Sequence, residues 1–291
     1  MRHLAFFFFQ FLNFTIFRFP LSLLYLLADF IYLFLTYIVG YRKKIIQENF
    51  KRSFPELNNT EIVKLRKRYL HYMSDLIIET IKAGHFTPKQ IQKRIYCTNP
   101  EVINKYYKDK KSVLVMLGHT GNWEWAGLVA SFLFKHNIRS VYQIQSNPYF
   151  DAFIRKTRQR FGAELIPSKQ ALRKIISHKN DASVFFLLAD QSPAQHETGI
   201  WTNFLNQNSA FSTSIEKIAI QLDIPVIFAK LVFVKRGYYR VDFEEIASNP
   251  KETQTGEITL KFAELLENQI KTQPVFWLWS HRRWKRKPPV T

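Results

Sequence analysis

The stretch Val113–Glu124 reads VLVMLGHTGNWE, and it decides the fold class of this chain of 291 residues. Its first five residues form an uninterrupted apolar run, as in a strand that is buried within a sheet. Gly121 then permits a sharp turn, and Asn122 suits the cap of a helix that begins near Trp123. The stretch therefore predicts a strand, a tight loop and a helix in succession.

Short β-rich runs alternate with helical ones through the rest of the chain. This alternation predicts an α/β fold, with a central mixed sheet flanked by helices, over residues 111–291. The expected strands are Val113–Leu117, Ser140–Ile144, Val184–Ala189, Val226–Val234 and Tyr238–Phe243. The expected helices are Trp123–Lys135, Asn147–Phe161, Lys169–His178, Ser212–Leu222 and Leu260–Lys271.

Upstream of this core, apolar residues recur at helical spacing in Tyr41–Phe50 and Glu61–Lys82. Thr60 is the expected cap of the second helix. The two helices predict a helical subdomain at residues 42–110, so that residues 42–291 form one domain with a helical part and an α/β part.

Residues 1–41 differ from the rest, because Arg18 and Asp29 are the only charged side chains between Leu4 and Gly40. Leu21–Gly40 is long enough to cross a hydrocarbon core of about 30 Å as a helix. The basic run Arg42–Lys44 directly after it places the remaining chain on the cytoplasmic side of the inner membrane. We expect a membrane anchor that either spans the bilayer or lies in its interface. A cleaved signal peptide is the alternative.

The composition favours an anionic partner, because 42 Lys and Arg against 23 Asp and Glu give a formal net charge of +19. With 27 Phe, 13 Tyr and 6 Trp, the chain suits a membrane interface better than nucleic acid, for which no recognised motif is present. The single cysteine, Cys97, excludes internal disulfides and a cysteine-built zinc site. We expect neither a metal nor a nucleotide cofactor, because the sequence has no metal-ligand spacing of histidines and no glycine-rich phosphate loop.

His119 and Glu124 are the candidate catalytic pair. On one continuous helix they would lie about 140° apart, so they cannot share a helical face. With His119 in the loop and Glu124 in the first helical turn, the carboxylate can fold back and orient the imidazole as a general base. The alternative is a structural histidine in a turn and a glutamate that the helix dipole favours.

The segment from His119 to Trp125 resembles the H-x4-D/E box of glycerolipid acyltransferases. The surrounding chain resembles the branch that adds late, secondary acyl chains to lipid A, and this resemblance extends almost from end to end. Its further boxes are Tyr41–Lys44 with Glu48-Asn49, Phe54–Leu57, Arg158–Gly162, Ala189–Gln191, Gly199–Trp201 with Phe204, and Leu278–Lys285.

The resemblance implies a fold of the glycerolipid-acyltransferase type and an O-acyltransferase activity. The donor would be a fatty acyl thioester of acyl carrier protein or of coenzyme A, and the acceptor a hydroxyl of a lipid A precursor or a related membrane lipid. The resemblance assigns His119 as the base, Glu124 as the residue that orients it, and further roles to Arg158 and Asp190. Arg158 would bind a phosphate or stabilise the developing oxyanion, and Asp190 would support substrate positioning.

The same boxes lead us to expect further contacts with substrate, and Arg155 and Arg160 lie close enough to compete for the role of Arg158. After Phe204 the family usually has another aromatic residue and a glycine, whereas this chain has Leu205-Asn206. Donor length and acceptor identity therefore stay open. The expected contacts are Asn122, Arg155, Arg160, Gln191 and Phe204.

Three classes of function remain. The first is the membrane-bound acyltransferase, and the second is a non-catalytic membrane protein that binds anionic lipids through its basic surface. The third is a hydrolase in which the same dyad activates water. The C-terminal run His281–Lys287 would contact anionic headgroups or an acidic carrier protein, or else form a solvated basic tail.

Overall fold

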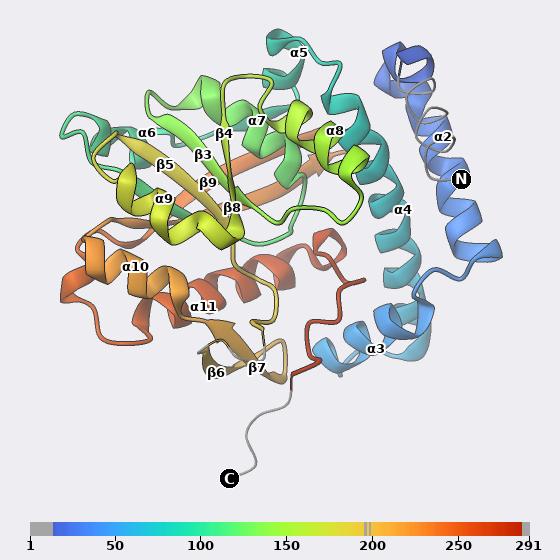
Figure 1. Ribbon diagram of the computed structural model, residues 1–291. Helices are drawn as coiled ribbons and strands as arrows, with labels where there is room; N and C mark the ends of the chain where they lie inside the picture. Colours follow the sequence, from blue (N-terminus) through green and yellow to red (C-terminus); the bar gives the residue numbers. More distant parts are fainter. Residues whose placement is uncertain (1–13, 195–196, 198, 287–291) are drawn as a thin grey trace.

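A seven-stranded mixed sheet forms the centre of the computed structural model, which describes residues 14–194, 197 and 199–286 (Figure 1). The central strand β2 pairs in parallel with β5 on one side and β8 on the other. β8 and β9 are antiparallel, and the other neighbours in this sheet are parallel. The predicted α/β fold is confirmed. The order is β1 (Ile95–Cys97), β9 (Tyr238–Ala247), β8 (Val226–Lys235), β2 (Val113–Leu117), β5 (Ser183–Leu188), β3 (Asn137–Tyr142) and β4 (Glu164–Pro167).

Helices cover both faces of the sheet, which explains why β2 is apolar throughout and buried at every position. Leu114 and Met116 face the core beneath α9, α10 and α11, whereas Val115 and Leu117 face the core beneath α7. Because both faces of β2 are packed, the strand fixes the position where the following loop begins. These helices are α7 (Trp123–Leu133), α9 (Ala171–Ser177), α10 (Ser214–Leu222) and α11 (Glu257–Thr272).

The helical part before the sheet is built around α4 (Asn59–Ala83). Asn58, rather than the predicted Thr60, caps this helix, because its side chain and that of Glu61 form a reciprocal capping box. The segment 42–110 is not wholly helical, since β1 lies within it and pairs with β9. The other helices here are α3 (Lys43–Ser53), α5 (Pro88–Gln92) and α6 (Glu101–Asn104).

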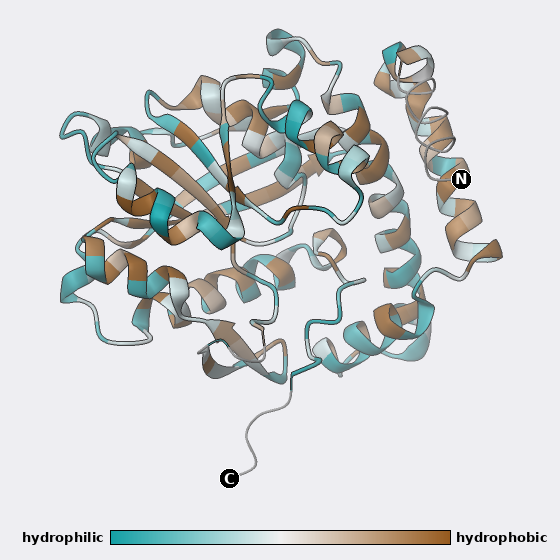
Figure 2. Ribbon diagram, viewed as in Figure 1, coloured by the Kyte–Doolittle hydropathy of each residue, from teal (hydrophilic) through white to brown (hydrophobic). Residues whose placement is uncertain are grey.

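The N-terminal apolar segment forms α2 (Leu21–Leu33), which continues into a wider turn, η2 (Phe34–Ile38). It lies alongside α4 and is mostly hydrophobic in Figure 2. By length and composition alone, Leu21–Ile38 is able to cross a membrane. Residues 1–13 of the predicted anchor lie outside the described part of the chain.

The sequence did not predict the strands β1, β4, β6 and β7. β6 (Gly199–Phe204) and β7 (Gln207–Ser212) form a separate hairpin, so the helix expected from Ser212 begins at Ser214 instead. The hairpin turn is Leu205-Asn206, where φ is +52° and +59°. Short turns of 3-10 helix complete the fold at Ile16–Arg18, Lys105–Tyr107, Ser168–Gln170, Pro250–Glu252 and Pro274–Phe276.

Candidate active site

His119 and Asp190 meet beyond the carboxyl ends of the adjacent strands β2 and β5. Nδ1 of His119 lies 2.6 Å from Oδ1 of Asp190, and the backbone N–H of His119 donates to Oδ2 at 2.9 Å. Asp190 thus fixes both the backbone and the ring of His119. The imidazole is 14% exposed, whereas the carboxylate is buried.

The environment of Asp190 keeps it ionised. Burial opposes ionisation, but the charge and the hydrogen bonds of His119, together with the indole N–H of Trp277 at 2.8 Å, lower the pKa of Asp190 to about 2. A carboxylate at Nδ1 favours the tautomer that carries its proton there. Nε2 of His119 is then free to accept a proton.

The loop between β2 and α7 is held from several sides. Gly121 has a φ of +54°, its N–H donates to the carbonyl of Phe276 at 2.9 Å, and its own carbonyl accepts from the hydroxyl of Tyr72. At Gly118, an added Cβ would lie 2.5 Å from a methyl group of Leu266. The positive φ of Gly121 favours glycine in this loop, and a side chain at Gly118 would require Leu266 to shift.

Glu124 does not orient His119 as predicted, because it pairs with Arg158. Nε of Arg158 donates to Oε2 of Glu124 at 2.8 Å, and Nη2 donates to Oε1 at 2.7 Å. The pair forms because Glu124 lies in the first turn of α7 and Arg158 is the last residue of α8 (Pro148–Arg158). The nearest carboxylate in the sequence is thus not the one that contacts the imidazole.

The Glu124–Arg158 pair is largely buried, with the two side chains 11% and 25% exposed. Burial disfavours the charged form of both side chains. The charge and the hydrogen bonds of the partner have the larger effect, so the pKa of Glu124 is lowered and the pKa of Arg158 is raised. Trp123 links this pair to the histidine: its indole N–H donates to Glu124 at 3.2 Å, and its ring lies edge-on to His119 with centroids 5.1 Å apart.

Glu79 is a buried residue that sequence reasoning missed. One of its oxygens accepts from the hydroxyl of Tyr25 at 2.5 Å, and the other accepts from Tyr239 and from the amide of Asn122, both at 2.7 Å. Burial raises the pKa of Glu79 to about 7, although these hydrogen bonds oppose the shift. Because Asn122 caps α7 by accepting from the N–H of Trp125, Glu79 supports the start of the helix that carries Glu124.

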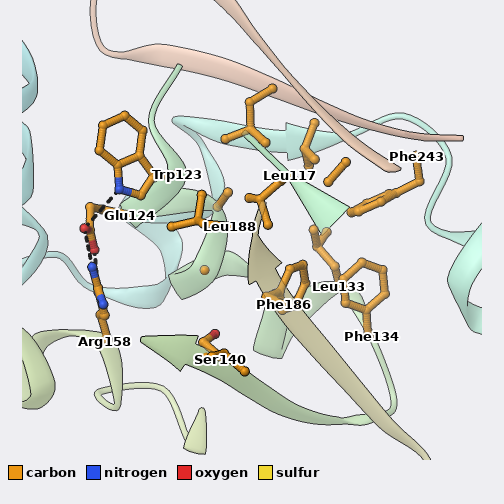
Figure 3. A pocket seen from close by; sticks show the side chains of 17 residues that line it. Leu117, Trp123, Glu124, Leu133, Phe134, Ser140, Arg158, Phe186, Leu188 and Phe243 are labelled. Atoms are coloured by element: carbon orange, nitrogen blue, oxygen red, sulfur yellow. Dashed lines mark hydrogen bonds and ion pairs between the residues drawn. The ribbon is translucent and has the colours of Figure 1, made fainter. Parts of the chain in front are cut away.

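An apolar pocket opens beside the Glu124–Arg158 pair (Figure 3). In the close-up, Trp123, Glu124 and Arg158 lie together at one end, and phenylalanine and leucine side chains line the other. Its walls come from α7 and from the strands of the central sheet. Among the lining residues are Leu117, Gly127, Ala130, Phe134, Phe186, Leu188 and Phe243.

Comparison with known families shows which family the chain belongs to. Residues 1–286 match the family described as bacterial lipid A biosynthesis acyltransferase, which is nearly the whole chain. The chain belongs to this family. It is therefore an acyltransferase, as the resemblance of its ordered boxes predicts. A search of curated proteins gave no significant match.

The remaining predicted contacts of this acyltransferase divide into buried and exposed residues. Asn122 and Phe204 are fully buried: Asn122 caps α7, and Phe204 packs against Trp277. Arg155 and Gln191 are exposed, and Arg160 donates to the carbonyl of Gly84. Of the three arginines considered, Arg158 is the one that reaches Glu124.

The C-terminal basic run of the acyltransferase is only partly a solvated tail, and Lys287 lies outside the described residues. Arg283 is buried, donates to the carbonyl of Ala210 at 2.6 Å and lies over the ring of Phe211. Trp284 donates to Ser209 at 2.7 Å. These contacts attach the C-terminal segment to the β6–β7 hairpin. Arg282 and Lys285, in contrast, are exposed.

Proposed function

We propose that this acyltransferase moves a fatty acyl chain from the thioester of acyl carrier protein or coenzyme A to a hydroxyl of a lipid A precursor, at the cytoplasmic face of the inner membrane. One observation carries this proposal: an imidazole oriented by a buried carboxylate contacts Trp123, and Trp123 lines an apolar pocket whose polar end holds the Glu124–Arg158 pair. The geometry suits a base that acts on a hydroxyl beside a bound acyl group.

In the proposed reaction, Nε2 of His119 accepts the proton of the acceptor hydroxyl as its oxygen attacks the thioester carbonyl. The carbon–sulfur bond of the tetrahedral intermediate then breaks, and the leaving thiolate takes the proton from His119. Asp190 remains ionised throughout and stabilises the imidazolium that forms between the two steps, because its pKa is low.

Arg158 lines the polar end of the pocket beside Glu124, and in this proposal the thioester carbonyl lies next to its guanidinium. A guanidinium so placed stabilises the oxyanion of the intermediate or binds a phosphate of a substrate. Glu124 holds it by two hydrogen bonds and therefore acts through Arg158. In this proposal Glu124 orients the guanidinium of Arg158, and it does not orient the imidazole of His119.

The apolar end of the pocket is suited to the acyl chain. Its lining is mainly hydrophobic, and its walls belong to packed elements of the core. Burying a methylene group contributes about 0.8 kcal/mol, so even part of a fatty chain would anchor the donor with its carbonyl near Arg158.

The test compares His119→Ala with His178→Ala, using a radiolabelled acyl thioester and purified lipid acceptor. His178 is a matched control because it lies at the opposite, amino ends of β2 and β5, where its backbone carbonyl accepts from Ser112 and Ser183 and its ring contacts Asp181. We expect His119→Ala to lose about 10²- to 10⁴-fold in transfer rate, and His178→Ala to stay near the parent. Full transfer by a folded His119→Ala protein would overturn the proposal.

The other two functions predict different outcomes of the same assay. A hydrolase would release labelled free fatty acid at the same rate with and without the acceptor lipid. A non-catalytic lipid-binding protein would produce neither product. An acyltransferase yields labelled lipid that depends on the acceptor, and mass spectrometry of that lipid identifies the acylated hydroxyl.

A further inference from the structure

One face of α2 and η2 is apolar and exposed to solvent. Half of the large apolar side chains that are exposed in the described structure lie between residues 14 and 39. Along the helix their spacing of three and four residues places them on one side. They include Leu23, Leu26, Phe30, Leu33, Phe34 and Tyr37.

The opposite face of α2 is bound to the catalytic domain over its whole length. Leu21, Leu24, Tyr25 and Ala28 are buried against the domain. Contacts with α4 recur from one end to the other, in antiparallel order. They join Phe17 to Lys82, Tyr25 to Glu79, Asp29 to His71, and Tyr37 to Lys67.

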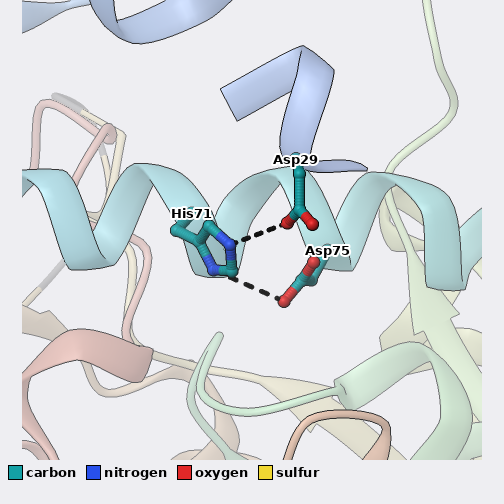
Figure 4. A group of neighbouring side chains, drawn as sticks. All are labelled: Asp29, His71 and Asp75. Atoms are coloured by element: carbon teal, nitrogen blue, oxygen red, sulfur yellow. Dashed lines mark hydrogen bonds and ion pairs between the residues drawn. The ribbon is translucent and has the colours of Figure 1, made fainter. Parts of the chain in front are cut away.

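Asp29, the one acidic residue of this apolar segment, faces the domain (Figure 4). Its Oδ1 lies 2.9 Å from Nε2 of His71 and 2.5 Å from Nη2 of Arg236. The same guanidinium nitrogen lies 2.5 Å from Asp75. Asp29 therefore joins α2 to α4 and to the turn between β8 and β9.

The group of Asp29, His71 and Asp75 also has the spacing of a metal site. Arg236 already supplies a cation to both carboxylates, with hydrogen bonds to each. These contacts make the group an ion-pair network that holds α2 in place.

We propose that α2 is a fixed part of the catalytic domain and lies in one leaflet of the membrane, embedded by its apolar face, without crossing the bilayer. The inference rests on the membrane association in the proposed function and specifies its geometry. If α2 crossed with these contacts intact, α4 from Lys67 to Lys82 and the turn with Lys235 and Arg236 would have to enter hydrocarbon. Charged groups there are strongly disfavoured.

The position of Asp29 supports the same conclusion. It lies at the middle of Leu21–Ile38, where a spanning helix would place it in the centre of the bilayer. In the leaflet arrangement it instead keeps its partner Arg236 on the side away from lipid.

The charges around the apolar face fit an anionic membrane surface. Arg18 stacks on Phe14 at one end, and Lys67 lies over Tyr37 at the other. Lys43 and Lys44 follow the segment and are exposed. An apolar stripe bordered by basic side chains is the pattern of helices that lie in a membrane interface.

This attachment has a consequence for the active site. α4 carries Tyr72 and Glu79, which hold the loop after His119 and the cap of α7. Because the same helix binds α2, the site is held at a fixed height above the leaflet, where a lipid hydroxyl is presented.

Depth measurements by spin labelling test the proposal independently of activity. Cys97 is the only cysteine, so Cys97→Ser gives a background for single cysteines. Labels at Leu23, Leu26, Phe30 and Phe34 are placed in the full-length protein in vesicles of phosphatidylethanolamine and anionic phosphatidylglycerol. Accessibility to oxygen and to a water-soluble nickel chelate then gives the depth of each label.

We expect all four labels at a similar shallow depth of about 5–10 Å. A label at Ile176, an exposed apolar residue of α9, should remain in water as the matched control. A depth that rises to roughly 15 Å near Phe30 and falls toward both ends would show a spanning helix and overturn the proposal. Water-exposed labels at all four positions would also overturn it, and would reject the membrane association while leaving the acyl-transfer assay unaffected.

Discussion

Asp190 accepts hydrogen bonds from both the backbone N–H and the imidazole Nδ1 of His119, at 2.9 and 2.6 Å. The two residues lie beyond the ends of paired parallel strands, so the sheet positions them. Glu124 and Arg158, in contrast, are positioned by the start of α7 and the end of α8. Trp123 contacts both pairs, but the hydrogen bonds within each pair come from different elements, so each pair can be tested by its own substitutions.

Replacing Asp190 by Asn tests the first pair. The amide removes the charge that stabilises the imidazolium and can present its NH2 group to Nδ1, which favours the wrong tautomer. We expect kcat to fall about 10²- to 10⁴-fold with a smaller change in KM. Steady-state kinetics on a protein whose circular dichroism matches the parent provides the measurement. A folded Asp190→Asn enzyme with parental kcat would contradict the assignment.

The second pair is tested by a double-mutant cycle on Glu124 and Arg158. Glu124→Ala leaves a mostly buried guanidinium unpaired, so we expect it to lower the free energy of unfolding by about 1–3 kcal/mol. The double variant with Arg158→Ala should cost less than the sum of the two single changes, because it leaves no unpaired charge. Urea unfolding measures all four proteins. Strict additivity would show that the pair is not coupled.

How far the sequence predicts this site depends on the distance along the chain over which each contact forms. The strand Val113–Leu117 and the loop after it were predicted correctly because a buried strand is apolar at every position. The partner of His119 was assigned wrongly, because Glu124 is near in sequence whereas Asp190 is brought close by the pairing of β2 with β5. Asp190 follows a predicted strand and Glu124 lies at the start of a predicted helix. The hydrophobic pattern of the sequence does not show which strands are neighbours in the sheet.

The cap of α4 and the role of Glu79 also differ from the prediction or were missed by it. The pattern Asn58-x-x-Glu61 is a capping box, so the start of α4 was readable and Thr60 was the wrong choice within it. Glu79 carried a weaker signal, as a carboxylate among apolar residues on a long helix. Its partners Tyr25 and Tyr239 come from distant segments, and no local pattern links them. β1 and β4 are too short for a periodic pattern to predict.

Glu79 predicts a dependence of stability on pH. Its folded pKa of about 7 lies above the ordinary 4.5, so its contribution to stability is fully present below about pH 4.5 and is lost as pH rises through about 7. The glutamine side chain of Glu79→Gln is neutral at every pH, so this variant should lack the fall in stability that ionisation of Glu79 causes. Thermal unfolding of parent and variant between pH 5 and 8 measures the difference, which should build up between about pH 5 and 7 and then stay constant. Parallel profiles for the two proteins would show that Glu79 does not titrate in this range.

The pocket provides the last prediction, through Gly127 in the middle of α7. A Cβ built at this position meets no atom within 4 Å, and the residue lines the pocket. Gly127→Ala should stabilise the helix by up to about 1 kcal/mol, since glycine is unfavourable inside a helix. Gly127→Leu should place its side chain in the space proposed for the acyl chain.

We expect Gly127→Leu to lower kcat/KM for long acyl donors by roughly ten- to a hundredfold, which corresponds to an overpacking cost of about 1–3 kcal/mol. Donors short enough to end before Gly127 should be affected much less. Gly84→Ala is the matched control, because Gly84 also has ordinary backbone angles but faces Thr157 outside the pocket. A series of acyl chain lengths measures the preference of each enzyme. If Gly127→Leu and the parent prefer the same chain length, the acyl chain does not occupy this pocket.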